Sequence, residues 1–109
     1  MRRTAIAVFL AFLLSACGSF QVGGDFDLAA FQSKVRRGET TQAEVQRILG
    51  APDGTGVSVE TGGERYTQWT YYYGSGNLSD TSNTRVKMLQ IKFDSAGVVR
   101  AYNWTANSR

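Results

Sequence analysis

The only cysteine of the chain, Cys17, follows a basic start and an uninterrupted apolar run. Residues 2–3 are arginines, residues 5–14 are apolar throughout, and residues 15–16 are small. A basic start, a short apolar stretch and small residues at its end form the pattern of a secretory signal peptide. A membrane-spanning helix needs about 20 apolar residues, so this run is too short to be one.

Three kinds of chemistry are open to Cys17: an inert buried thiol, a reactive thiol and lipid attachment. Free cysteines are often buried, but burial does not account for the flanking pattern. A reactive thiol needs a neighbouring group that lowers its pKa, and the chain contains no histidine. The order Leu-Ser-Ala-Cys at 14–17 resembles the bacterial lipobox, which implies cleavage before the cysteine and acylation of its sulfur and new amino group. We therefore predict a lipoprotein signal peptide over 1–16 and a lipid anchor on Cys17.

Cleavage before Cys17 changes the charge of the protein. The full chain carries a formal net charge of +3, and loss of Arg2 and Arg3 lowers it to +1. So small a charge gives no basis for nucleic-acid binding, and we predict no nucleic-acid partner. Lipid on the cysteine would hold the protein at a membrane. Gly18 follows, rather than the Asp that retains lipoproteins in the inner membrane, and this resemblance implies the periplasmic face of the outer membrane.

The remaining residues offer little catalytic chemistry. Without histidine, a Ser–His triad and a histidine-rich metal site are excluded. The nearest carboxylate pairs are Asp25 with Asp27 and Glu60 with Glu64, which we interpret as capping and loop charges. The glycines form no phosphate-binding motif. We predict no enzymatic activity, no cofactor and no metal.

The mature chain is short enough for one domain. We place this domain at 25–109, after a lipidated tether over 17–24. The tether contains three glycines, and a composition of this kind is typical of a mobile linker.

Two amphipathic helices are predicted at the start of the domain. In 25–38, apolar residues recur at spacings of three and four, with one of the two aspartates as the cap and Gly38 as the stop. The second helix, 41–49, begins with Thr41 and Glu44 in the spacing of a capping box.

Beyond residue 54 the apolar pattern changes to the alternation of strands. The predicted strands cover 57–61, 65–73, 85–94 and 98–104, with a turn at 62–63 and a polar loop over 74–84. The residues predicted to face inward are Thr67, Trp69, Tyr71, Tyr73, Leu89, Ile91 and Phe93. For the last strand two inward sets stay open, Val99 with Ala101 or Val98 with Tyr102 and Trp104.

These elements predict an α+β fold, with two N-terminal helices packed on one face of a three- to four-stranded antiparallel meander sheet. Because helices cover one face only, the other face meets solvent or a partner. On that face Tyr66, Tyr72 and Met88, with Val86, would form an exposed apolar patch and a candidate partner surface. The alternative is that the tyrosines shield the sheet and keep their hydroxyls in water.

The stretch VRRGETTQAEVQRILGAP at 35–52 resembles the second-helix signature of the SmpA/OmlA (BamE-like) lipoprotein family. The matching positions are Gly38, Thr41, Val45, Leu49, Gly50 and Pro52. Further along, Trp69 and Tyr71 match the W-x-Y strand of the family, and Phe93, Asp94 and Gly97 match its turn. The lipobox agrees, and the resemblance covers nearly the whole mature chain.

The resemblance implies a helix–helix–three-strand fold on the periplasmic face of the outer membrane. It also implies a non-enzymatic, accessory role in assembling outer membrane β-barrel proteins, through contacts with envelope proteins and anionic phospholipid. The doublet Thr40-Thr41 and the extra strand at 57–61 depart from the family pattern, so no contact residue is transferred from it.

Two other functions stay open. One is a stand-alone envelope lipoprotein that binds peptidoglycan or another envelope protein. The other is an inhibitor-like binding module, because the layout of a helix pair on a sheet resembles that of β-lactamase inhibitor proteins. A likeness of layout says little about function.

Overall fold

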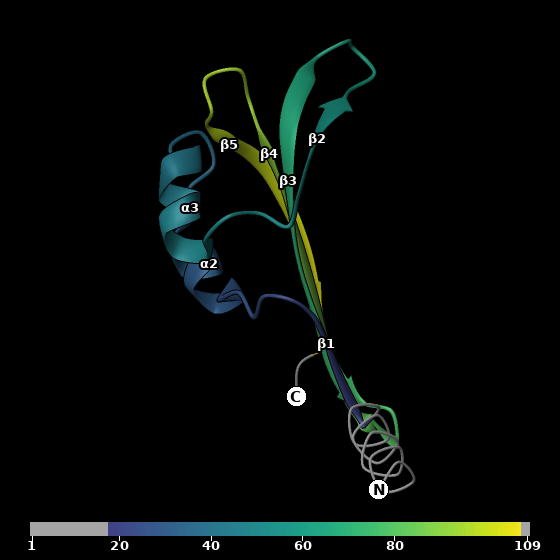
Figure 1. Ribbon diagram of the computed structural model, residues 1–109. Helices are drawn as coiled ribbons and strands as arrows, with labels where there is room; N and C mark the ends of the chain where they lie inside the picture. Colours follow the sequence, from purple (N-terminus) through teal and green to yellow (C-terminus); the bar gives the residue numbers. More distant parts are fainter. Residues whose placement is uncertain (1–17, 108–109) are drawn as a thin grey trace, which may run out of the picture.

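The computed structural model describes residues 18–107, so the predicted signal peptide and Cys17 lie outside it. The fold is α+β, with two helices and one antiparallel sheet of five strands, rather than the three to four predicted (Figure 1). Along the chain the elements are β1 (Ser19–Gly23), α2 (Leu28–Lys34), α3 (Gln42–Leu49), β2 (Gly54–Val59), β3 (Arg65–Asn77), β4 (Asp80–Phe93) and β5 (Val99–Ala106).

The first helix is shorter than predicted. Asp27 caps α2, and its carboxylate accepts a hydrogen bond from the Ala30 amide at 2.9 Å. The helix ends at Lys34 rather than near Gly38, because the Arg36 amide donates to the hydroxyl of Thr40 at 2.8 Å instead of continuing the helical ladder.

The second helix is confirmed at both ends. Thr41 is the N-cap of α3, and its hydroxyl accepts from the Glu44 amide at 3.3 Å. Gly50 ends the helix with a φ of 81°, a left-handed value that glycine adopts at little cost.

The long strand β3 lies at the centre of the sheet. Two strands share one of its edges: β2 pairs with residues 65–70 and β1 pairs with residues 73–77. Its other edge pairs with β4, which in turn pairs with β5. Between the segments of β3 that pair with β1 and β2, the carboxylate of Asp53 accepts a hydrogen bond from the Tyr72 amide at 2.9 Å. This backbone amide of β3 therefore has a partner where neither neighbouring strand supplies one.

The predicted tether is a strand for most of its length. Within 17–24, Ser19–Gly23 forms β1, with Ser19 opposite Asn77 and Gly23 opposite Tyr73. Composition alone indicated a linker because of the glycines. A neighbouring strand edge changes the outcome, because it supplies the hydrogen bonds that a glycine-containing segment needs to become ordered.

The prediction of a polar loop over 74–84 is also wrong. β3 and β4 continue through most of it as a hairpin and reverse at Leu78–Ser79. Glycine, serine, threonine and asparagine are typical of loops. Here, however, the 74–77 end of β3 pairs with β1 on one edge and with β4 on the other. One irregularity in register, between Ser75 and Asn77, accommodates it.

The predicted hairpin turn at 62–63 and the additional strand before it are confirmed. β2 covers Gly54–Val59, a few residues earlier than predicted, and Gly63 has a φ of 84° in the turn. The Gly63 amide donates to the Glu60 carbonyl at 2.9 Å and closes this turn.

One buried cluster joins both helices to the sheet. Phe31 of α2 and Val45 of α3 are fully buried in it. Six of the seven sheet residues predicted to face inward lie in this cluster or against it, so the face assignment is confirmed for them. The exception is Thr67, which is exposed, as is Val57 opposite it in β2. The buried apolar residues are Phe26, Phe31, Val45, Tyr71, Leu89, Ile91, Phe93 and Val99, with Trp69, Tyr73 and Tyr102 packed against them.

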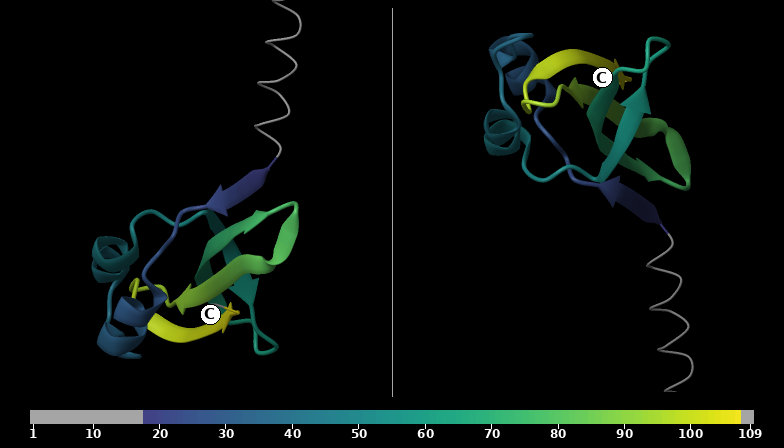
Figure 2. Two further views of the ribbon diagram at one scale, coloured as in Figure 1. Left: turned by 90° about the horizontal axis from the view of Figure 1, so that it is seen from below. Right: turned by 90° about the horizontal axis from the view of Figure 1, so that it is seen from above.

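In the last strand, one residue from each of the two predicted inward sets faces the core: Val99 from the first and Tyr102 from the second. Phe93 pairs with Val99 and Lys92 pairs with Ala101, so Arg100 is an extra residue in β5. This bulge resets the alternation, and Val99 and Tyr102 both face the core. Tyr102 meets Phe31 of α2 edge to face, with ring centroids 5.3 Å apart, and Figure 2 shows α2 beside β5.

Candidate interaction surface

The structure brings two of the three predicted surface residues together. Tyr72 of β3 and Met88 of β4 are directly opposite in the ladder, and their side chains therefore share one face. Since Tyr71 is buried, alternation places both on the face away from the core. Tyr66 lies on the same face but six positions earlier in β3, about 20 Å away along the strand.

Tyr72 and Met88 belong to a part of the sheet that extends beyond the helices, which we call the arm. The arm consists of β1, residues 72–77 of β3 and residues 80–88 of β4 (Figure 1). Its outer face carries five exposed apolar side chains, which we call the arm patch. They are Phe20 (40% exposed), Val22 (53%), Tyr72 (38%), Val86 (42%) and Met88 (43%).

Two glycines of β3 make the arm patch continuous across three strands. Gly74 is opposite Val22 on one side and Val86 on the other, so no side chain separates the two valines. Gly76 leaves room for the ring of Phe20, because a Cβ at this glycine would lie 2.9 Å from that ring. Apolar residues from β1 thereby extend the surface formed by Tyr72.

Phe20 and Val22 were not predicted as surface residues. Their signal was present in the sequence Ser-Phe-Gln-Val-Gly, where apolar residues alternate over a stretch assigned to the tether. Five residues are too few to distinguish a strand from a linker without knowledge of the partner edge.

The opposite face of the arm is polar and is fixed to the body by Lys87. Its ammonium group forms an ion pair with Asp25 and donates to the Phe26 carbonyl at 2.6 Å. It also lies 5.0 Å from the centroid of the Phe26 ring and 5.4 Å from that of Tyr73. The arm is therefore amphipathic, and its polar side holds the segment that leads into α2.

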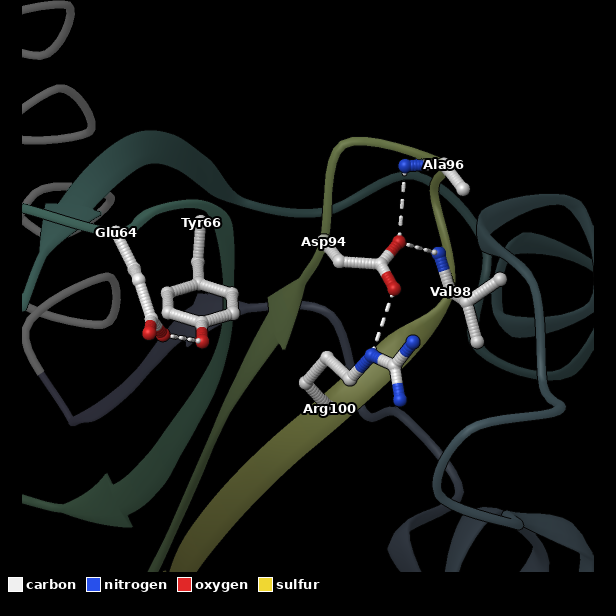
Figure 3. Close-up of polar contacts among 6 residues, drawn as sticks. All are labelled: Glu64, Tyr66, Asp94, Ala96, Val98 and Arg100. Atoms are coloured by element: carbon white, nitrogen blue, oxygen red, sulfur yellow. Dashed lines mark hydrogen bonds and ion pairs between the residues drawn. The ribbon is translucent and has the colours of Figure 1, made fainter.

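Tyr66 lies in a charged corner of the same sheet face. Its hydroxyl donates to the Glu64 carboxylate at 2.6 Å, and this hydrogen bond is the main cause of the raised pKa of Tyr66 (Figure 3). Close by, Asp94 accepts from the Ala96 and Val98 amides and from Arg100. These donors, above all Val98, lower the pKa of Asp94.

The two pairs of carboxylates that could have served as acid and base have other partners. Asp25 pairs with Lys87 and Asp27 caps α2. Glu60 pairs with Lys92 at 2.7 Å, and Glu64 accepts from the hydroxyl of its neighbour Tyr66. Within residues 18–107, no three His, Cys, Asp or Glu side chains gather as metal ligands would.

One hollow lies between α2 and the end of β5. It has a volume of about 340 Å³ and is lined by Asp27, Leu28, Ala29, Gln32, Lys87, Trp104 and Ala106. Trp104 is half-exposed at its wall and stacks on Tyr102 at 6.0 Å. The polar groups of Asp27 and Lys87 in its lining are already engaged in the cap and the ion pair.

No family model, curated protein or solved structure matches this chain. In the part of the chain that the structure describes, no helix is long and apolar enough to cross a membrane. Cys17, the predicted lipidation site, lies outside residues 18–107.

Proposed function

We propose that this chain is a lipid-anchored, non-enzymatic interaction domain on the periplasmic face of the outer membrane. In this proposal Cys17 carries the lipid, and the domain is an accessory component of outer membrane β-barrel protein assembly, as in the SmpA/OmlA (BamE-like) family. The proposal includes contacts with envelope proteins and with anionic phospholipid headgroups.

The observation that carries the proposal is the arm patch. Contiguous exposed apolar surface on a soluble domain often marks a site of interaction. Aromatic residues and methionine are enriched at the centres of protein interfaces, and the patch contains Phe20, Tyr72 and Met88. Gly74 pairs with Val22 on one side and with Val86 on the other, which supports a single apolar surface rather than scattered apolar residues.

The proposal also assigns the two faces of the sheet different roles. α2 and α3 cover the inner face, and the outer face of the arm binds a partner. The shared burial of Phe31 and Val45 with Leu89 and Ile91 supports the first part. Alternation along β3, which turns Tyr71 inward and Tyr72 outward, supports the second.

A lipid on Cys17 would give this surface its functional context. An anchored domain meets membrane proteins at a raised effective concentration, so even a small patch can bind its partner for a useful fraction of the time. A modest interface is then sufficient, which agrees with the limited number of residues in the arm patch.

Crosslinking in intact cells tests this function, with wild type compared with Cys17→Ala and crosslinked proteins identified by mass spectrometry. We expect barrel-assembly subunits with the wild type and their loss with the unanchored variant. Recovery of cell-wall material or unrelated envelope proteins alone would contradict the assembly role and favour a stand-alone lipoprotein. Unchanged partners and unchanged membrane fractionation in Cys17→Ala would contradict the anchor.

A further inference from the structure

The described chain begins at the tip of the arm. The carbonyl of Gly18 accepts a hydrogen bond from the Leu78 amide at 3.2 Å, and Ser19 is opposite Asn77 at the end of the ladder. Cys17 precedes Gly18, and consecutive Cα atoms are about 3.8 Å apart. Any lipid on that cysteine is therefore attached one residue from the turn between β3 and β4.

The tip carries one apolar side chain among small polar ones. Leu78 is 63% exposed. Beside it, the carboxamide oxygen of Asn77 accepts from the amide of Ser79 at 3.0 Å and from its hydroxyl at 2.7 Å, so these polar groups are paired within the turn. The Asp80 carboxylate accepts from Ser82 in the same way. A turn with satisfied polar groups and a projecting leucine suits the boundary between lipid headgroups and acyl chains.

β1 makes the link between the lipid and the body stiff. Its five residues pair with β3 from Ser19 to Gly23. At the inner end, Gly23 has a φ of 73°, and a Cβ there would lie 2.0 Å from the Tyr72 carbonyl oxygen. The strand therefore fits against β3 only because residue 23 is glycine.

We infer that the tip of the arm is the end of the protein that contacts the membrane, with Leu78 seated in the lipid interface and the arm acting as a rigid stalk. This inference rests on the lipid anchor of the proposed function. The occupant of the tip is the bilayer itself, because the chain outside the described residues leaves at that point. Tyr72 is five residues from Asn77, so the end of the arm patch formed by Tyr72 and Met88 stands about 17 Å from the membrane surface, within reach of the periplasmic parts of an embedded protein. Phe20, opposite Gly76, lies at the membrane end of the patch.

A depth probe at the tip tests this geometry. Leu78→Cys introduces the only free thiol once the sulfur of Cys17 is acylated, and it can be labelled with an environment-sensitive fluorophore. The purified lipidated protein is placed in phosphatidylethanolamine–phosphatidylglycerol vesicles that carry a headgroup quencher. The matched control is Val59→Cys, an exposed position opposite Arg65 and about 40 Å from the tip along β3.

We expect quenching of the label at position 78 and none at position 59. Three further variants examine the stalk. Gly23→Ala should detach β1 and abolish quenching at position 78, whereas Gly24→Ala, whose added Cβ meets nothing within 4 Å, should retain it. Twelve Gly-Ser residues inserted after Cys17 reach about 19 Å and leave the described fold untouched, so they should also abolish quenching.

The outcomes separate this inference from the proposed function. Lipidated, vesicle-bound protein with an unquenched label at position 78 overturns the stalk but leaves the anchor intact. Equal quenching with the inserted Gly-Ser linker overturns it as well. A protein mass without lipid overturns the anchor, and the inference with it.

Discussion

At the scale of single residues, neighbours decide what a side chain does. Tyr66 and Tyr72 lie on the same strand and the same face, yet the first donates its hydroxyl to Glu64 and the second lies opposite Met88 in the arm patch. Tyr71, between them in the sequence, is 1% exposed and donates to the Gly50 carbonyl at the end of α3. One residue type thus has three roles within seven positions.

Substitution of Tyr71 tests the inward role. We expect Tyr71→Phe to lower the free energy of unfolding at neutral pH by about 1 kcal/mol, because the ring is kept and one hydrogen bond, 2.9 Å long, is lost. Urea unfolding measures the change. Tyr72→Phe, at an exposed position of the same strand, is the control and should change little.

The same variant has a defined pH dependence. Burial raises the pKa of Tyr71 from 10.0 to about 12, so the fold favours the neutral phenol. This contribution is complete below pH 10 and is lost as the pH rises towards 12. The stability difference between wild type and Tyr71→Phe should therefore shrink over that interval. A difference that stays constant from pH 9 to 12 would contradict the assigned pKa.

At the scale of elements, a single buried threonine joins a helix, a turn and a strand. Thr40 is 3% exposed, its hydroxyl accepts from Arg36 after α2, and its carbonyl accepts from the Val99 amide of β5 at 2.8 Å. It forms a doublet with Thr41. The structure gives the two threonines separate tasks, since Thr41 caps α3.

This division of tasks predicts the effect of removing the Thr40 hydroxyl. Thr40→Val keeps the volume and leaves the Arg36 amide without its acceptor, so we expect a loss of about 1–2 kcal/mol in unfolding free energy. Thr40→Ser retains the hydroxyl and should recover most of that loss. Equal stability of the valine and serine variants in chemical denaturation would show that the hydrogen bond contributes nothing.

At the scale of the whole molecule, the sheet has a body that shares a buried cluster with the helices and an arm that extends beyond them (Figure 1). The body holds the buried cluster. The arm holds the exposed apolar residues of the outer face and the end of the described chain near the predicted anchor. The proposed interaction surface is thereby separate from the buried cluster, so we expect that the arm patch can be altered without disturbing the core.

That separation predicts a binding defect without a folding defect. We expect Tyr72→Ala with Met88→Ala to reduce the yield of crosslinked partner at least about tenfold, which corresponds to about 1.4 kcal/mol. The unfolding free energy should change by no more than about 0.5 kcal/mol per exposed site.

The control removes similar apolar groups elsewhere. Val57→Ala with Val59→Ala lies on β2, outside the arm, and should leave the yield unchanged. Tyr66→Ala alone should also leave it unchanged, because that tyrosine belongs to the charged corner. Loss of partner through Tyr66→Ala but not through the Tyr72 and Met88 variant would place the binding site in that corner instead.

Elements whose signals are local could be predicted from the sequence alone. The cap and stop of α3, the turn at 62–63 and the inward alternation of Tyr71, Leu89, Ile91 and Phe93 are all present as predicted. Capping needs only residues within one helical turn, and alternation needs only the pleat of one strand. The α+β class followed from these signals.

Elements that depend on a distant neighbour could not be predicted in this way, because their partners are found only in the folded protein. β1 and the 74–77 end of β3 look like linker and loop by composition, and each becomes a strand because the other supplies its hydrogen bonds. The bulge at Arg100 likewise depends on the pairing of β5 with β4, which turns Val99 and Tyr102 to the same side. The arm patch exists for the same reason, since strand pairing alone brings Phe20 and Val22 beside Tyr72.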